Sequence, residues 1–206
     1  MSIFPLFSVL VLPWTFLILV IPSFASILTA TIDDSAGDSL NPGVQPVYSP
    51  SDAFSPNSNC DGCLARPDPG NAFDNSWHDT SQFGGASPHS VTLSFTGIGI
   101  DVFCILANTV PGAATNTNLV FTIDGTPYPP FSRDPDETTN YLYNQNVLSV
   151  NGLSQNAHTL VISTNNASGT LLLFDYARYR SVFYPFTLHV LIWNLVTRYQ
   201  IPRLPP

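Results

Sequence analysis

Ser90-Val-Thr-Leu-Ser-Phe-Thr96 alternates apolar and polar residues without a break, which puts Val91, Leu93 and Phe95 on one face. Alternation with a period of two is typical of a β-strand that is buried on one side only. The run Ile100-Asp-Val-Phe-Cys-Ile-Leu106, which follows it, is apolar on both faces and indicates a central strand covered on both sides. These neighbouring runs predict a fold built from β-strands.

The same two patterns recur further along the chain. Residues 118–124 and 158–164 alternate, whereas residues 171–174 are apolar throughout. Asp124-Gly125 is a signal for a two-residue hairpin, and no segment between residues 32 and 179 shows a sustained helical period. Many short strands separated by turn residues predict an all-β fold, a jelly-roll β-sandwich of two antiparallel sheets.

The two ends of the chain have a different character. Residues 3–21 are almost wholly apolar, and Ser23-Phe24-Ala25 supplies a small-x-small cleavage pattern. Residues 1–25 are therefore predicted to be a signal peptide, a hydrophobic leader helix whose length would also suit an uncleaved signal anchor. The sandwich is predicted to span residues 27–179. Residues 180–206 lack alternation, and we expect either a poorly packed, irregular or partly helical tail, or translated intron sequence from a gene-model artefact.

Charge and composition favour a location outside the cell. The 206 residues include fourteen acidic and six basic side chains, for a formal net charge of −8. A chain this acidic repels phosphate backbones and anionic lipid surfaces. We therefore expect no nucleic-acid partner, and membrane contact only through the leader if it stays uncleaved. With the leader and the glycosylation acceptor Asn166-Ala-Ser168, this predicts a secreted or cell-surface glycoprotein.

Cys60-Asp-Gly-Cys63 is the first candidate site. In an oxidising compartment, cysteines at this spacing can close a local disulfide across Gly62, which is the favoured interpretation. A redox pair needs the start of a helix in an α/β setting, and zinc needs two further ligands, so both are weaker alternatives. Cys104 lies in an apolar strand and is predicted to be a buried free thiol; a bridge from Cys104 to Cys60 or Cys63 is the alternative.

Trp77-His78-Asp79 is the second candidate site. An exposed Trp77 could stack on the apolar face of a sugar ring while His78 and Asp79 bind its hydroxyl groups, with His89 and Phe83 completing the rim. The structural alternative is a corner in which Trp77 plugs one end of the sandwich and the polar side chains satisfy loop backbone groups.

Three carboxylates near Gly37 form the third candidate site. Asp33, Asp34 and Asp38 could bind a structural Ca²⁺ together with backbone carbonyl groups, because calcium prefers six to eight oxygen ligands. The alternative is an acidic turn that caps the ends of strands. We expect no other cofactor.

Signals for catalysis are weak. The chain contains neither a Gly-x-Ser-x-Gly elbow nor a His-Glu-x-x-His motif. Asp101 lies inside an apolar run, where a buried carboxylate needs a partner. We expect either a structural ion pair with Arg133 or Arg178, or a strand edge on which Asp101 faces solvent.

A set of motifs, in order, resembles a family of basidiomycete proteins whose biochemical activity is uncharacterised. Members are secreted or membrane-anchored, and have a galactose-binding-like β-sandwich ectodomain, often followed by a Ser/Thr-rich stalk and one transmembrane helix. The resemblance implies that fold for residues 31–179 and carries no assigned activity. Residues 180–206 stand where the stalk would begin. The motifs include Thr31-Ile-Asp-Asp-Ser-Ala-Gly-Asp38, Cys60-x-x-Cys63, Trp77-His-Asp-Thr80, Phe103-Cys-Ile-Leu-Ala-Asn-Thr-Val-Pro-Gly112 and Leu173-Phe-Asp-Tyr-Ala177.

Taken together, the sequence predicts a non-catalytic extracellular or cell-surface module that recognises cell-wall or surface glycans. The main alternative is a structural ectodomain, a spacer without a ligand. A carbohydrate-active enzyme, such as a hydrolase or lyase, is less favoured, because no catalytic motif stands out.

Overall fold

Ten antiparallel β-strands build the structure, a computed structural model that describes residues 25–56, 60–83, 87–165 and 169–183. The predicted all-β class is confirmed. The loop between β4 and β5 carries two short 3₁₀ turns, η3 (Pro69–Asn71) and η4 (Phe73–Asn75), and η1 (Ser51–Ala53) precedes β4. The strands are β1 (Ser26–Asp33), β2 (Gly37–Asp38), β3 (Val47–Ser49), β4 (Ser55–Pro56), β5 (His78–Gln82), β6 (Ser90–Ala107), β7 (Thr117–Ile123), β8 (Thr126–Arg133), β9 (Tyr141–Thr164) and β10 (Thr170–Phe183).

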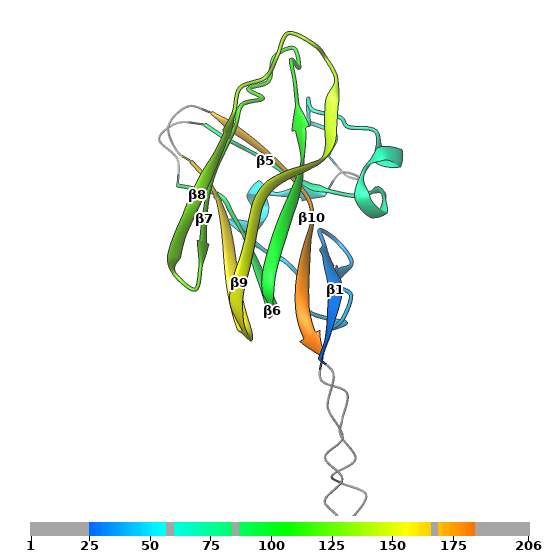
Figure 1. Cartoon of the computed structure of the whole chain (residues 1–206). Coiled ribbons are helices and arrows are strands. Elements are labelled where there is room, and N and C mark those ends of the chain that lie inside the picture. The colour runs from blue at the N-terminus through cyan, green and yellow to red at the C-terminus, as the bar shows by residue number, and fades with distance from the viewer. Residues whose placement is uncertain (1–24, 57–59, 84–86, 166–168, 184–206) are drawn as a thin grey trace, which may run out of the picture. The chain divides into compact units, whose positions relative to one another are not determined.

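Hydrogen bonding connects all the strands into one curled sheet in the order β2-β1-β10-β6-β9-β7-β8 (Figure 1). β3 adds to β6, and β5 adds to β10 and carries β4 on its other edge. The hairpin predicted at Asp124-Gly125 joins β7 to β8, and both residues have the positive φ that such a turn requires. The path begins at β2 and ends at β8, so the strands form one curled sheet in place of the two separate sheets that the sequence predicted.

Glycines allow the long strands to bend. β6 and β9 pair along most of their lengths, with a register shift between Gly97 and Gly99. A Cβ at Gly97 would overlap the carbonyl oxygen of Arg180, and one at Gly99 would lie 2.5 Å from the carbonyl oxygen of Val150. The two strands predicted over residues 90–96 and 100–106 are thus one bent strand, because its bend needs residues without a side chain.

Two hydrophobic clusters fill the two sides of the sheet. The larger cluster contains Val91, Leu93 and Phe95, the predicted buried face of the alternating run. The second half of β6 supplies both clusters: Val102, Cys104 and Leu106 face the larger one, and Ile105 and Ala107 face the smaller one. A strand covered on both sides has to be apolar on both sides. The smaller cluster contains Trp77, the aromatic residue of the second candidate site.

The described unit spans Ser26–Phe183, so β10 continues beyond the predicted end at Tyr179. Its last residues pair with the start of β1. This extension supplies the partner of Asp101, because Arg180 lies 2.5 Å from its carboxylate. The expected partners, Arg133 and Arg178, make other contacts: Arg133 bonds the Ala107 carbonyl, and Arg178 stacks on Phe103.

Several predictions fall on residues outside the described ranges: the leader up to residue 24, the tail from residue 184, and Asn166. Within the described ranges, none of the helices has the length and hydrophobicity to cross a membrane.

Candidate functional site

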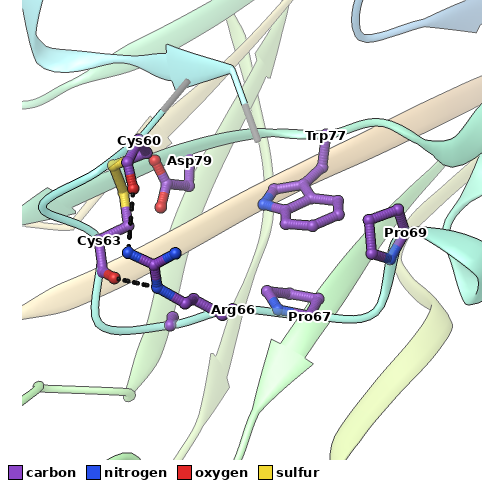
Figure 2. Close-up of a pocket in the computed structure, with 8 residues that line it drawn as sticks. Cys60, Cys63, Arg66, Pro67, Pro69, Trp77 and Asp79 are labelled. Carbon is purple, nitrogen blue, oxygen red and sulfur yellow. Dashed lines mark hydrogen bonds between the residues drawn. A yellow bond between two sulfur atoms is a disulfide. The ribbon is translucent and has the colours of Figure 1, made fainter. Parts of the chain in front are cut away.

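A small pocket lies beneath the Cys60–Cys63 disulfide, beside β5 (Figure 2). We call it the disulfide pocket. Its volume is about 200 Å³, below the roughly 300–1,000 Å³ of pockets for drug-sized ligands. It therefore has room for a single small ring rather than a chain of them. The lining residues are Cys60, Cys63, Ala65, Arg66, Pro67, Pro69, Trp77 and Asp79.

The predicted disulfide between Cys60 and Cys63 is confirmed, with a Cα–Cα distance of 5.3 Å. The loop that it closes also contains a turn, in which the Cys63 N–H donates to the Cys60 carbonyl at 3.3 Å. Cys104 is a free buried thiol, also as predicted, so the alternative bridges to it are wrong. Burial raises the pKa of the Cys104 thiol, which keeps it protonated and unreactive.

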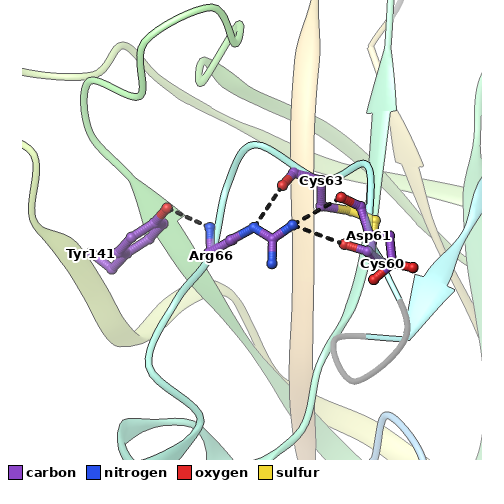
Figure 3. Close-up of a disulfide and its surroundings, with 5 residues drawn as sticks. All are labelled: Cys60, Asp61, Cys63, Arg66 and Tyr141. Carbon is purple, nitrogen blue, oxygen red and sulfur yellow. Dashed lines mark hydrogen bonds between the residues drawn. A yellow bond between two sulfur atoms is a disulfide. The ribbon is translucent and has the colours of Figure 1, made fainter.

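Arg66 lies beside this loop and holds it by hydrogen bonds (Figure 3). Its guanidinium group donates to the carbonyl oxygens of Cys63 at 3.0 Å, Asp61 at 2.9 Å and Cys60 at 3.5 Å. Arginine suits this task because its planar group offers several donors in a fixed geometry. The disulfide loop is consequently fixed by hydrogen bonds as well as by the covalent bond.

Two tyrosines on β9 anchor the next segment of the pocket wall. The Arg66 N–H donates to the Tyr141 hydroxyl at 2.7 Å, and the Asp68 N–H donates to the Tyr143 hydroxyl at 2.6 Å. Residues two apart on a strand share a face, so both hydroxyls meet the same stretch of loop. Sequence reasoning missed this contact, and the pattern Tyr-x-Tyr was the available signal.

Trp77 is buried and does not form a binding platform. Its side chain is only 4% exposed and packs with Ile105, Leu171 and Leu173 in the smaller cluster. Figure 2 shows its ring beside the rings of Pro67 and Pro69, at the inner end of the pocket. The exposed platform predicted from the sequence is therefore wrong. The burial of Trp77 agrees with the structural alternative. The polar part of that alternative differs, because His78 bonds the Asp34 side chain rather than a loop backbone group.

The predicted rim also fails because its members lie on opposite sides of β5. Successive side chains on a strand alternate between faces, so Trp77 and Asp79 reach the disulfide pocket whereas His78 points away. The Nδ1 atom of His78 lies 2.7 Å from the Asp34 carboxylate, and its ring stacks on Tyr48 with centroids 4.2 Å apart.

His89 and Phe83 are also separate from the disulfide pocket. The Nδ1 atom of His89 lies 2.6 Å from the Thr80 hydroxyl, on the same side of β5 as His78. Phe83 is 65% exposed and lies just beyond the end of β5. Of the four residues predicted to bind a ligand, the pocket thus gathers only Trp77 and Asp79.

Asp79 is the acidic side chain among the described residues that line the pocket. It is 7% exposed, and burial raises its pKa to about 6, an effect that the nearby His78 only partly offsets. One of its carboxylate oxygens and the two sulfur atoms of the disulfide all lie within 4.8 Å of one another. A carboxyl group that titrates near neutrality therefore stands directly beside the disulfide.

The three carboxylates expected to bind calcium do not converge. The Asp33 carboxylate accepts bonds from the Ser35 and Ala36 N–H groups at 2.9 and 2.6 Å, while Asp38 accepts bonds from the Leu40 N–H and the Tyr179 hydroxyl, both at 2.9 Å. In the described ranges, the only group of three acidic, cysteine or histidine side chains at metal-binding distance is Cys60, Cys63 and Asp79. The calcium prediction is corrected accordingly: these carboxylates cap turns and strand ends.

Asp34 likewise serves the fold. Its carboxylate accepts a bond from the Ser76 hydroxyl at 2.5 Å in addition to its contact with His78. It therefore ties the start of β5 to the end of β1, which are far apart in the sequence. This contact gives the buried carboxylate of Asp34 and the half-buried ring of His78 their hydrogen-bond partners.

Asp175 completes an acidic cluster that sequence reasoning did not assemble. It is fully buried, and its carboxylate accepts a bond from the Phe73 N–H at 3.0 Å. Burial, reinforced by the negative charges of Asp34 and Asp33, raises its pKa to about 7 despite that bond. The second oxygens of Asp33 and Asp175 receive no hydrogen bond from any described residue. A proton on Asp175 removes its negative charge and therefore lowers the electrostatic repulsion between Asp175 and the carboxylates of Asp33 and Asp34.

No protein-family model and no curated protein matches the chain. Among solved structures, the catalytic domain of Agl-KA is similar over 80% of this chain and 30% of its own length, at 11% identity and a TM-score of 0.45. A Paenibacillus sp. cycloisomaltooligosaccharide glucanotransferase complexed with cycloisomaltoheptaose is similar over 50% of this chain and 14% of its own (18% identity, TM-score 0.36). A family two carbohydrate esterase from Clostridium thermocellum, in complex with cellohexaose, is similar over 52% and 26% (24% identity, TM-score 0.31). This chain thus spans less than a third of each, and the likeness informs neither ligand nor activity.

Proposed function

We propose that this chain is a non-catalytic, secreted or cell-surface module of the jelly-roll, galactose-binding-like type, and that it recognises the end group of a glycan in the disulfide pocket. The pocket is the observation that carries the proposal. It combines the Asp79 carboxylate with the apolar rings of Pro67, Pro69 and Trp77. Sugars present hydroxyl groups together with apolar ring faces, so a site of this composition complements them.

The size of the pocket supports recognition of one terminal ring. At about 200 Å³ the cavity does not admit a polysaccharide chain along its length. Its walls are pre-organised, because Arg66 and the hydroxyls of Tyr141 and Tyr143 hold the loop in place. Pre-organised walls reduce the entropic cost of binding a small ligand.

The acid content of the pocket supports binding rather than hydrolysis. Glycosidases generally act with a pair of carboxylates on either side of the scissile bond. Among the described residues that line the pocket, Asp79 is the only carboxylate. A single carboxylate suffices to accept hydrogen bonds from sugar hydroxyls.

A structural ectodomain without a ligand is the second candidate. Two observations favour it: Trp77 is packed into the smaller cluster, and the Arg66 donors are used by carbonyl groups of the disulfide loop. In this case the pocket is only the crevice left beneath a pinned loop.

A glycan array with the full, disulfide-bonded chain distinguishes these candidates. We expect binding to a subset of glycans with a common end group. Asp79→Asn, which keeps the shape of the pocket but removes the charge, should weaken binding about 10- to 100-fold, because hydrogen bonds to charged groups contribute about 1.5–3 kcal/mol.

Asp52→Asn is the matched control, because Asp52 is exposed in η1, away from the pocket lining. It should bind like the unmodified chain. Absence of binding to any glycan, or equal binding by the Asp79→Asn variant, would contradict the proposal and favour the spacer. All binding assays contain a chelator, so that metal ions play no part in the result.

A further inference from the structure

The disulfide and the carboxylate beside it bring three potential metal ligands together. The Sγ atoms of Cys60 and Cys63 and a carboxylate oxygen of Asp79 all lie within 4.8 Å of one another. Figure 2 shows the Asp79 side chain beside the two sulfur atoms, at the edge of the pocket. These three side chains come from a loop and from β5, which the fold brings together.

We propose that reduction of the Cys60–Cys63 disulfide converts this corner into a Zn²⁺ site, formed by two thiolates and the Asp79 carboxylate. The fourth position faces the disulfide pocket and is filled by water or by a small ligand. This site goes beyond the proposed glycan recognition, which concerns the oxidised chain.

The ligand set fits zinc. Zinc takes four ligands in a tetrahedral arrangement, readily binds cysteine thiolates and carboxylate oxygens, and commonly uses two cysteines at the C-x₂-C spacing of Cys60 and Cys63. Three protein ligands with one open position is the arrangement of zinc sites that bind exchangeable ligands.

Formation of the zinc site begins with reduction of the disulfide and continues with binding of the ion. A dithiol or phosphine reductant supplies two electrons, the S–S bond breaks, and two protons convert both sulfur atoms to thiols. Binding of Zn²⁺ then displaces these two protons, because metal ligands must be deprotonated. A dithiol gives up its own two protons and becomes a disulfide, whereas a phosphine takes the oxygen atom of a water molecule to become its oxide and that water supplies the two protons. The zinc ion does not change oxidation state.

The loop is held in place by contacts that do not depend on the S–S bond. Arg66 bonds the carbonyl groups of Cys60, Asp61 and Cys63 through its side chain, and Tyr141 holds the Arg66 N–H (Figure 3). Both cysteines therefore stay near Asp79 after reduction. A zinc ion with two thiolates and one carboxylate carries a net negative charge, and the Arg66 guanidinium lies next to it to offset that charge.

Asp79 is available as a ligand. It is 7% exposed, and no described residue donates a hydrogen bond to its carboxylate. A buried carboxylate without a donor is destabilising unless it finds a partner. Cys104, the third cysteine, does not compete for the zinc ion, because it is buried in the larger cluster.

Zinc titration of the full chain, oxidised or reduced with a phosphine, tests this inference. We expect the reduced chain to bind one Zn²⁺ in competition with a chromophoric chelator, and the oxidised chain to bind it at least 100-fold more weakly. Substitution of Co²⁺ should produce the absorption typical of thiolate-to-cobalt charge transfer. Zinc should also raise the melting temperature of the reduced chain.

The Asp79→Asn variant tests whether zinc binds at the three-residue site or only to two cysteines in an open loop. We expect it to weaken zinc binding at least tenfold, whereas Asp61→Asn, an exposed charge change in the same loop, should leave it unchanged. The inference is overturned if the reduced chain binds no zinc, if oxidised and reduced chains bind it equally, or if both variants bind it alike. If reduction unfolds the chain, equal zinc binding by the Asp79→Asn and Asp61→Asn variants likewise overturns the inference. Glycan binding is measured on the oxidised chain with a chelator, so the two proposals succeed or fail separately.

Discussion

Asp175 shows how one side chain can make the stability of the domain depend on pH. The carboxyl group is fully buried near Asp33 and Asp34, and its pKa is about 7. In the unfolded chain it would titrate near its usual 3.8. The folded state therefore binds a proton more tightly than the unfolded state between these two pH values. Asp79, with a pKa of about 6, acts in the same direction.

Raised carboxyl pKa values predict that the domain becomes less stable as the pH rises. The stabilisation is complete below about pH 4 and declines up to about pH 7, with a slope of up to about 1.4 kcal/mol per pH unit for each group. Thermal unfolding followed by circular dichroism should therefore give a higher Tm at pH 5 than at pH 8. His158, whose pKa is also raised, adds to the same trend.

Asp175→Asn isolates the contribution of this residue. The substitution keeps an oxygen for the Phe73 N–H and removes the titration, so the difference in Tm between pH 5 and pH 8 should shrink. Asp124 and Asp136, whose pKa values are lowered by hydrogen bonds, stay ionised across this window and do not disturb it. A Tm that increases towards pH 8 would show that Asp175 and Asp79 are ionised in the folded state.

At the scale of elements, β5 and β6 decide how the candidate residues are distributed. β5 alternates, so Asp79 enters the disulfide pocket and His78 turns to Asp34. The second half of β6 also alternates, so that Cys104 and Leu106 join the larger hydrophobic cluster while Ile105 joins the smaller one. The site therefore depends on strand geometry more than on the nearness of residues in the sequence.

The bend of β6 predicts a large penalty for Gly97→Ala. The new methyl group would overlap the carbonyl oxygen of Arg180, which belongs to the backbone of β10 and cannot move aside alone. We expect a loss of about 1–3 kcal/mol, typical of overpacking, measured as a lower midpoint in urea unfolding. Gly62→Ala is the control, since a Cβ there meets nothing within 4 Å. Equal midpoints for both variants would mean that the bend is not tightly packed.

For the whole molecule, the pairing of the first and last long strands joins the start of the described chain to its end. β1 and β10 pair from Ser26 with Phe183 to Asp33 with Tyr176. Arg180, within this pairing, also holds Asp101 of β6. Residues 180–183 thus belong to the domain, although sequence reasoning assigned them to the tail.

The pairing of β1 with the end of β10 predicts that two truncations differ sharply. A chain that stops after Tyr179 loses the last pairs with β1 and leaves Asp101 without Arg180, whereas a chain that stops after Phe183 keeps both. At about 1 kcal/mol for each lost hydrogen bond, the shorter chain should melt several degrees lower in differential scanning calorimetry. Identical melting of the two chains would place the end of the domain at Tyr179.

Local patterns were sufficient to predict the all-β class, the buried face of residues 91–95, the two-sided burial of residues 100–106, the Cys60–Cys63 disulfide and the free Cys104. Each depends on a period of two or on a short spacing, which the chain encodes within a few residues. The same patterns did not predict that Trp77 is covered, that Tyr141 and Tyr143 hold the disulfide loop, or that Asp175 joins Asp33 and Asp34. These contacts join residues 28 positions apart (Trp77 and Ile105) to 142 positions apart (Asp33 and Asp175), and they exist only once the sheet has curled. Burial is decided by which element packs on which, so the change of Trp77 from a predicted exposed rim residue to a buried residue that lines the disulfide pocket was determined by the tertiary structure.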